Sequence, residues 1–212
     1  MFDVDPSKLR PLPSADDEVR SVGTTLGAEP SAVLIDTAAT EDALKRHPLA
    51  DYRVLHLAAH GLPSTRFPAR AAVLLRAGGN DDGVLQAREI LLLRLNADLV
   101  TLSACDTGSG SIHGQDGPPS LVRPFLASGA RAVVANLWAA DDAFSLALMR
   151  AFYRELASGA DIATALRDAK REMLVKFGPQ AVPRLWSGVV AYGDARGTIA
   201  TSPRTATAAV GR

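Results

Sequence analysis

Short apolar runs rich in β-branched residues alternate along this chain with amphipathic segments of helical period. The predicted strands are residues 32–35, 52–59, 72–75, 99–102, 131–137 and 183–192. The predicted helices are residues 14–26, 40–47, 86–93, 120–128, 141–157 and 161–177. Such alternation predicts an α/β fold with a mainly parallel sheet flanked by helices. Residues 194–212 show no period, so we expect one domain over residues 1–193 followed by a disordered tail.

Two of the predicted strands end in a reactive side chain next to small or glycine residues. The run Tyr52–Ala59 leads to His60 and Gly61, and the run Leu99–Leu102 leads to Cys105 in the sequence SACDTG. The carboxyl ends of parallel strands meet at one edge of a sheet, where α/β proteins bind ligands. The pattern therefore predicts a cysteine–histidine dyad at that edge.

A dyad of this kind supports nucleophilic attack on an acyl carbon. A histidine can take the thiol proton and later protonate the leaving amine. The backbone amides of Gly61 and Cys105 are natural donors to the developing oxyanion. The alternative is that Cys105 is simply a buried core residue, because cysteine is among the most buried residue types.

Other polar residues have simpler interpretations beside the functional ones. His56 and His60 form an H-x-x-x-H pattern, but the strand-like context and the missing third ligand favour a core histidine at position 56, so we expect no metal. Asp141 and Asp142 fit the start of a helix, where acids stabilise the helix dipole. They could also pair with a basic substrate side chain, and the two roles are compatible.

Composition narrows the function classes. The chain has 212 residues, a net charge of zero and a single cysteine. A neutral chain gives no reason to expect a nucleic-acid or membrane surface, and one cysteine excludes an internal disulfide framework. The N-terminus lacks the features of a signal peptide. We expect a cytoplasmic protein without a cofactor, and the excess of arginine over lysine is typical of a GC-rich bacterial genome.

Several segments together resemble the CHAT family, caspase-like domains often found beside tetratricopeptide repeats. The similar segments are VLHLAAHG (54–61), DLVTLSACDTG (98–108), FLASGARAVVANLW (125–138) with Asp141 and Asp142, FYREL (152–156), ALRDA (165–169) and WSGVVAYG (186–193). The resemblance covers roughly residues 10–193. It implies a three-layer α/β sandwich, and family members usually carry more sheet upstream of residues 1–13.

The resemblance also implies site roles. His60 would be the acid/base, Cys105 the nucleophile, and the amides of Gly61 and Cys105 the oxyanion hole. Separases, which are related, imply by analogy that Asp141 or Asp142 lines the pocket for a basic residue. Ser103 stands where metacaspases have an acid, which weakens that preference, and with Asp106 it completes the expected substrate-binding set.

The expected function is thus that of a cysteine endopeptidase acting on a protein or peptide. Two alternatives stay open. One is a silent or partner-gated interaction module, with a tetratricopeptide-repeat or other regulatory protein as partner. The other is acyl transfer or hydrolysis on a small molecule by the same dyad.

Overall fold

The computed structural model describes residues 2–3, 5–9, 11–64, 66–103, 121–138 and 141–199, and the backbone of 206–211. Its strands are β1 (Val33–Leu34), β2 (Tyr52–Ala58), β3 (His60–Leu62), β4 (Ala72–Leu74), β5 (Val84–Gln86), β6 (Leu99–Leu102), β7 (Ala132–Asn136), β8 (Val189–Gly193) and β9 (Ala206–Gly211). Its helices are α1 (Ala15–Leu26), α2 (Glu41–Arg46), α3 (Ala87–Ile90), α4 (Val122–Ala127), α5 (Asp142–Ala157), α6 (Ile162–Phe177) and α7 (Pro183–Trp186). Short 3-10 turns cover Pro6–Lys8, Pro30–Ala32, Asp36–Ala38, Leu49–Asp51, Pro68–Arg70 and Gly178–Gln180.

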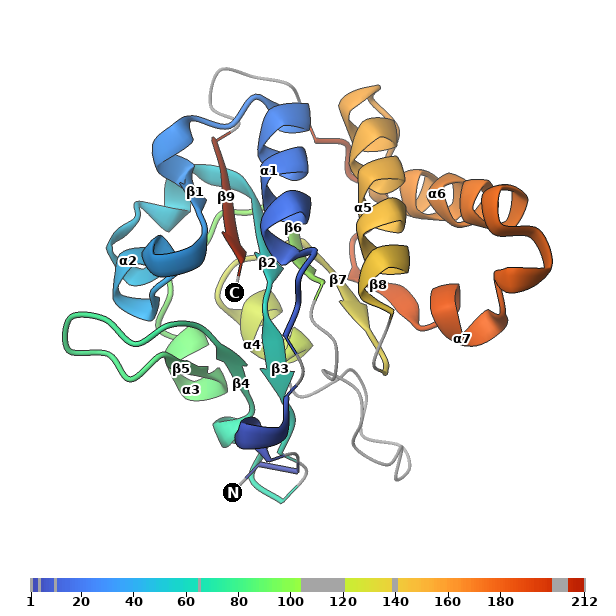
Figure 1. The fold of residues 1–212 in the computed structure, drawn as a ribbon. Coiled ribbons are helices and arrows are strands. Elements are labelled where there is room, and N and C mark those ends of the chain that lie inside the picture. The colour runs from blue at the N-terminus through green and yellow to red at the C-terminus, as the bar shows by residue number, and fades with distance from the viewer. Residues whose placement is uncertain are drawn as a thin grey trace.

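A six-stranded sheet in the order β1-β9-β2-β6-β7-β8 forms the centre of the fold (Figure 1). Every neighbouring pair in it is parallel except β7 and β8. A second, antiparallel sheet contains β3, β4 and β5. The arrangement is the expected three-layer α/β sandwich with a mainly parallel sheet.

Alternate residues of the central strands enter two separate cores. Leu55 and Leu57 of β2 join a core with Leu44 of α2, Ile90 of α3 and Phe125 of α4. The other face of the sheet packs against α5 and α6. Strands covered on both faces read as continuous apolar runs, which explains the sequence of β2 and β6.

Local capping signals set several helix boundaries as predicted, whereas Ser14 makes no side-chain cap hydrogen bond and the helix expected over residues 86–93 covers only Ala87–Ile90. Gly27 ends α1 in the left-handed conformation, at a φ of 68° that glycine adopts without a steric penalty. Thr40 accepts a hydrogen bond from the Ala43 amide at the start of α2, and Asp161 accepts one from the Thr164 amide at the start of α6. Among the described residues, no helix is both long and apolar enough to cross a membrane.

Two expectations about the C-terminal part are wrong. Residues 183–192 were expected to form one strand, but Pro183 starts the short helix α7, and β8 begins only at Val189. Proline fits the first turn of a helix because its missing amide is unpaired there anyway.

The expected disorder from residue 194 onward is also not what the structure shows. Ile199 is buried, and Ala206–Gly211 forms β9, which pairs in parallel with both β1 and β2. This segment is rich in alanine and has no alternation, so its local pattern gave no strand signal. Pairing with two neighbouring strands outweighs a weak local propensity.

Candidate functional site

The two segments that carry the predicted dyad leave the sheet side by side. β2 and β6 are parallel neighbours, with Leu57 opposite Leu102. The amide of Ser103 donates a hydrogen bond to the carbonyl oxygen of Leu57, at 3.0 Å. From there one chain runs through Ala59 to His60, and the other runs toward Cys105. Both Cys105 and Asp106 lie outside the described residues.

His60 is the first residue of β3 and belongs to the small sheet. It pairs with Leu74 of β4, and Gly61 pairs with Val73. His60 as a whole residue is 8% exposed, and it lines an open pocket of about 310 Å³. His60 follows the strand that ends at Ala58, as the sequence predicted, but the start of a second sheet at His60 was missed because β3 has only three residues.

The other predicted site residues have clear structural partners. Asp141 Oδ1 accepts a hydrogen bond from the Phe144 amide at 2.9 Å, so Asp141 caps α5 as predicted. Asp142 Oδ2 accepts one from the amide of Ser14 at 2.9 Å, which ties the start of α5 to the start of α1. Ser103 is buried at the end of β6, and its hydroxyl has no hydrogen-bond partner among the described residues.

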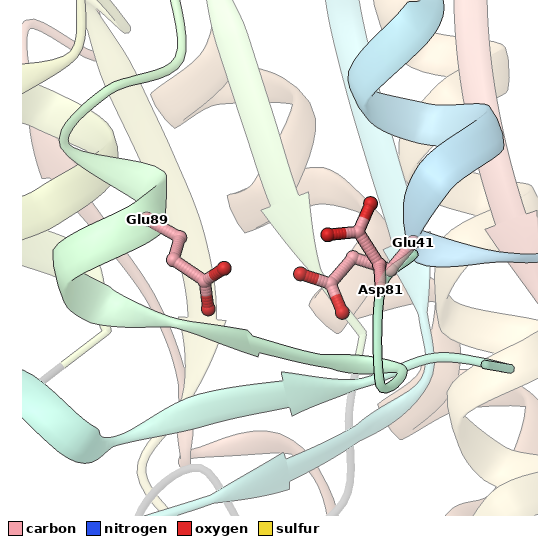
Figure 2. A group of neighbouring side chains, drawn as sticks. All are labelled: Glu41, Asp81 and Glu89. Atoms are coloured by element: carbon pink, nitrogen blue, oxygen red, sulfur yellow. The ribbon is translucent and has the colours of Figure 1, made fainter. Parts of the chain in front are cut away.

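Three carboxylates from separate parts of the chain lie close together (Figure 2). They belong to Glu41 of α2, Asp81 of the turn between β4 and β5, and Glu89 of α3. The Lys45 ammonium lies 2.6 Å from Glu41, 2.9 Å from Asp81 and 2.9 Å from Glu89. Glu41 also accepts a hydrogen bond from the Gly83 amide, at 2.9 Å.

This cluster has the donor set of a divalent-cation site, but an ammonium group lies among the three carboxylates. Burial raises the pKa of Glu41, and hydrogen bonding to Lys45 opposes that shift. Burial would also raise the pKa of Glu89, but the Gln86 amide and Lys45 outweigh it, so the net shift is downward. The cluster is therefore an ion-pair anchor for the strands that carry His60. Sequence reasoning missed it because only the Glu41–Lys45 pair has local spacing.

A second set of buried polar groups lies between the sheet, α1 and α5. His56 Nε2 is 2.9 Å from Oε1 of Glu18, and His56 Nδ1 is 3.0 Å from the hydroxyl of Tyr153. That hydroxyl donates to Thr101 Oγ1 at 2.7 Å. Burial raises the pKa of Tyr153, which keeps the phenol protonated and able to donate. His56 is fully buried, and this confirms its interpretation as a core histidine.

Comparison with known families places these features in context. Residues 3–194 match the model of the CHAT domain. The chain belongs to the CHAT domain family. Its α/β sandwich is the caspase-like fold that the sequence resemblance implied, and the match spans every strand of both sheets except β9.

Two curated relatives extend the comparison. The chain is 27% identical to tetratricopeptide repeat protein 28 of Mus musculus in an alignment of 217 positions that covers 87% of this chain and 9% of the relative. It is 26% identical to the protein of the same name in Homo sapiens, covering 87% of this chain and 8% of the relative. The chain thus spans less than a tenth of the length of these relatives.

Proposed function

We propose that this CHAT domain is a cysteine endopeptidase in which Cys105 is the nucleophile and His60 the acid/base. The observation that carries the proposal is the parallel pairing of β2 and β6, with the Ser103 amide bonded to Leu57. His60 and Cys105 each follow this pair of strand ends by a few residues. Cys105 follows Ser103 by only two residues, and this short separation along the chain supports the proposal.

In the proposed reaction, the His60 imidazole takes the Cys105 thiol proton, and the thiolate attacks the carbonyl carbon of the peptide. The amides of Gly61 and Cys105 stabilise the oxyanion. The carbon–nitrogen bond then breaks as His60 protonates the departing amine, leaving a thioester on Cys105. Water, activated by His60, hydrolyses the thioester and restores the thiol and the neutral imidazole.

The single cysteine makes the dyad directly measurable, because any thiol reagent reports on Cys105 alone. We expect the alkylation rate of the wild-type protein to follow a thiol pKa below the ordinary value of about 8.5. In His60→Ala that pKa should return to about 8.5, whereas His47→Ala, at the end of α2, should leave it unchanged. An identical pH profile for the wild type and His60→Ala would contradict the dyad.

Cleavage itself is tested on a peptide library read by mass spectrometry. The wild type should produce cleavage products, and Cys105→Ala should produce none. The expected loss for His60→Ala is about 10²–10⁴-fold, the usual size of a general acid–base contribution. Equal cleavage by the wild type and Cys105→Ala would remove the endopeptidase assignment. Turnover of simple thioesters but not of peptides would favour the small-molecule alternative.

The remaining predicted substrate-binding residues form part of the same proposal. Ser103 and Asp106 flank Cys105 and would contact the substrate near the cleaved bond. For Asp141 and Asp142, one carboxylate oxygen each is already hydrogen-bonded, so a basic preference depends on the second oxygen. Asp142→Asn keeps an acceptor for the Ser14 amide and removes the charge. If Asp142 binds a basic residue, this variant should lose cleavage after arginine selectively.

A partner-gated regulatory module is the second candidate. The observation that favours it is that the curated relatives are tetratricopeptide repeat proteins, of which this chain matches less than a tenth. We propose a tetratricopeptide-repeat protein as the partner in that case. Gel filtration and peptide turnover, with and without such a protein from the same genome, separate the two. Turnover by the isolated monomer would exclude gating.

A further inference from the structure

The N-terminal residues 5–9 and 11–13, here named the strap, pass beside β3 and are fixed at both ends. On one side the Asp3 amide donates to the carbonyl oxygen of Pro63, at 2.8 Å, just beyond β3. On the other side the Ser14 amide donates to Asp142 at the start of α5. Figure 1 shows this segment, in dark blue, running along β3 toward the start of α1. The strap is therefore a fixed wall and not a free end.

The sequence of the strap suits a wall better than a further strand. Pro6, Pro11 and Pro13 have no amide hydrogen to donate, and the described residues of the strap form no strand of the small sheet. Five residues of the strap line an open pocket of about 310 Å³ together with His60 and Leu74; they are Pro6, Leu9, Pro11, Leu12 and Pro13.

The lining of this cavity has a definite chemistry. The described residues around it are Pro6, Leu9, Pro11, Leu12, Pro13, Leu74 and His60. His60 is the one titratable group among them, and none is an acid, a lysine or an arginine. Burying a leucine-sized side chain in this pocket would strengthen binding by about 10- to 100-fold. A charged side chain would bind more weakly there, because it would lose its hydration without gaining an ion-pair partner among the described lining residues.

We propose that this cavity, the strap pocket, binds an apolar side chain of the peptide substrate beside the cleaved bond. The proposal rests on the endopeptidase function, because His60 is both a wall of the pocket and the proposed acid/base. It names the substrate class as protein segments with a leucine- or phenylalanine-sized residue near the scissile bond. Asp142 then acts through the Ser14 amide as a positioning residue for the pocket wall.

The test measures binding without catalysis. Cys105→Ala protein labelled with ¹⁵N-histidine is titrated with blocked peptides Ac-Ala-Ala-X-Ala-Ala-NH₂, in which X is leucine, arginine or aspartate. The leucine peptide should shift the His60 ring signal saturably and bind at least about tenfold more tightly than the other two. Equal affinities, or no shift at His60, would overturn the proposal.

Charge-swap variants at Leu9, a half-buried wall residue, sharpen the test. Leu9→Asp should weaken the leucine peptide at least about tenfold and improve the arginine peptide, and Leu9→Lys should improve the aspartate peptide instead. The matched control is Leu92→Asp, at a leucine that is 81% exposed and does not line the pocket. Because both variants put a charge at the same place, general loss of folding cannot mimic opposite preferences. Unchanged preferences in both would also overturn the proposal.

The experiments distinguish failure of the pocket proposal from failure of the endopeptidase proposal. If the leucine peptide binds at His60 but the wild type cleaves no peptide, the endopeptidase assignment fails and the pocket stands. If the wild type cleaves peptides without any preference for apolar residues, the pocket fails and the dyad stands.

Discussion

Removing the Lys45 ammonium should loosen the small sheet that carries His60. In Lys45→Met the apolar stem is largely kept, and three carboxylates lose their shared counter-ion. Their oxygens lie within 4.8 Å of one another, so each ionised pair would repel by about 3.5 kcal/mol or more at an effective dielectric constant near 20. Glu41 is 1% exposed and would protonate, whereas Asp81 and Glu89 are about a quarter exposed and can turn toward water.

Because Glu41 can take up a proton and the other two carboxylates can turn toward water, the destabilisation is smaller than that of breaking a fully buried ion pair. We expect Lys45→Met to lower the free energy of unfolding by about 2–4 kcal/mol. For a chain of this size that lowers the melting temperature by about 4–16 °C. The control is Lys176→Met, at an exposed lysine of α6, which should change stability by less than about 0.5 kcal/mol. Scanning calorimetry measures both variants.

The same reasoning predicts a gained property. Lys45→Ala leaves three carboxylates around an open space, and oxygen ligands of this kind suit Ca²⁺. Excess Ca²⁺ should therefore raise the melting temperature of Lys45→Ala and not that of the wild type. The reasoning is refuted if Lys45→Met has the same melting temperature as Lys176→Met, or if Ca²⁺ does not raise the melting temperature of Lys45→Ala.

Three further predictions concern stability. The pKa of Glu89 is lowered in the fold, so the ionised carboxylate stabilises the protein above its unfolded pKa of 4.5, and this stabilisation is lost as the pH falls below that value. In urea titrations, Glu89→Gln should therefore lose less unfolding free energy on acidification than the wild type. Equal losses in the two proteins would contradict the ion pair. Tyr153→Phe should lower the free energy of unfolding by about 2–4 kcal/mol, because His56 and Thr101 lose the hydroxyl that they share. In urea unfolding, the double variant Tyr153→Phe, Thr101→Val should lose about 1 kcal/mol less than the sum of the two single losses. Strictly additive losses would refute the coupling. Deleting residues 206–212 removes the strand between β1 and β2 and should destabilise the domain by more than about 3 kcal/mol, so an unchanged urea midpoint would show that β9 contributes nothing.

Features encoded by neighbouring residues were predictable from the sequence. Gly27, Asp141 and Asp161 mark helix ends through contacts within one turn, and the structure has those ends as expected. The strand leading to Leu102 and the one ending before His60 were likewise visible as apolar runs. What failed depended on partners far along the chain. β9 has a weak pattern and is a strand because β1 and β2 lie on either side of it.

The candidate site shows the same division. That His60 follows a strand was predictable, whereas its support was not, because Asp81 and Glu89 reach Lys45 from 36 and 44 residues away. The contact between Asp142 and the Ser14 amide joins residues 128 positions apart. No periodicity or local motif encodes such contacts.

The contact between Asp142 and the Ser14 amide also bears on the two proposals about substrate specificity. In one proposal Asp142 binds a basic substrate residue. In the other, Asp142 holds the strap, which lines the pocket beside His60. A carboxylate that already accepts an amide hydrogen bond has less negative potential to offer a guanidinium, and turning it toward a substrate would release the strap. The two roles therefore compete for one side chain. Among the described residues, the lining of the strap pocket is apolar apart from His60, so the anchoring role of Asp142 agrees with the proposed preference for an apolar side chain.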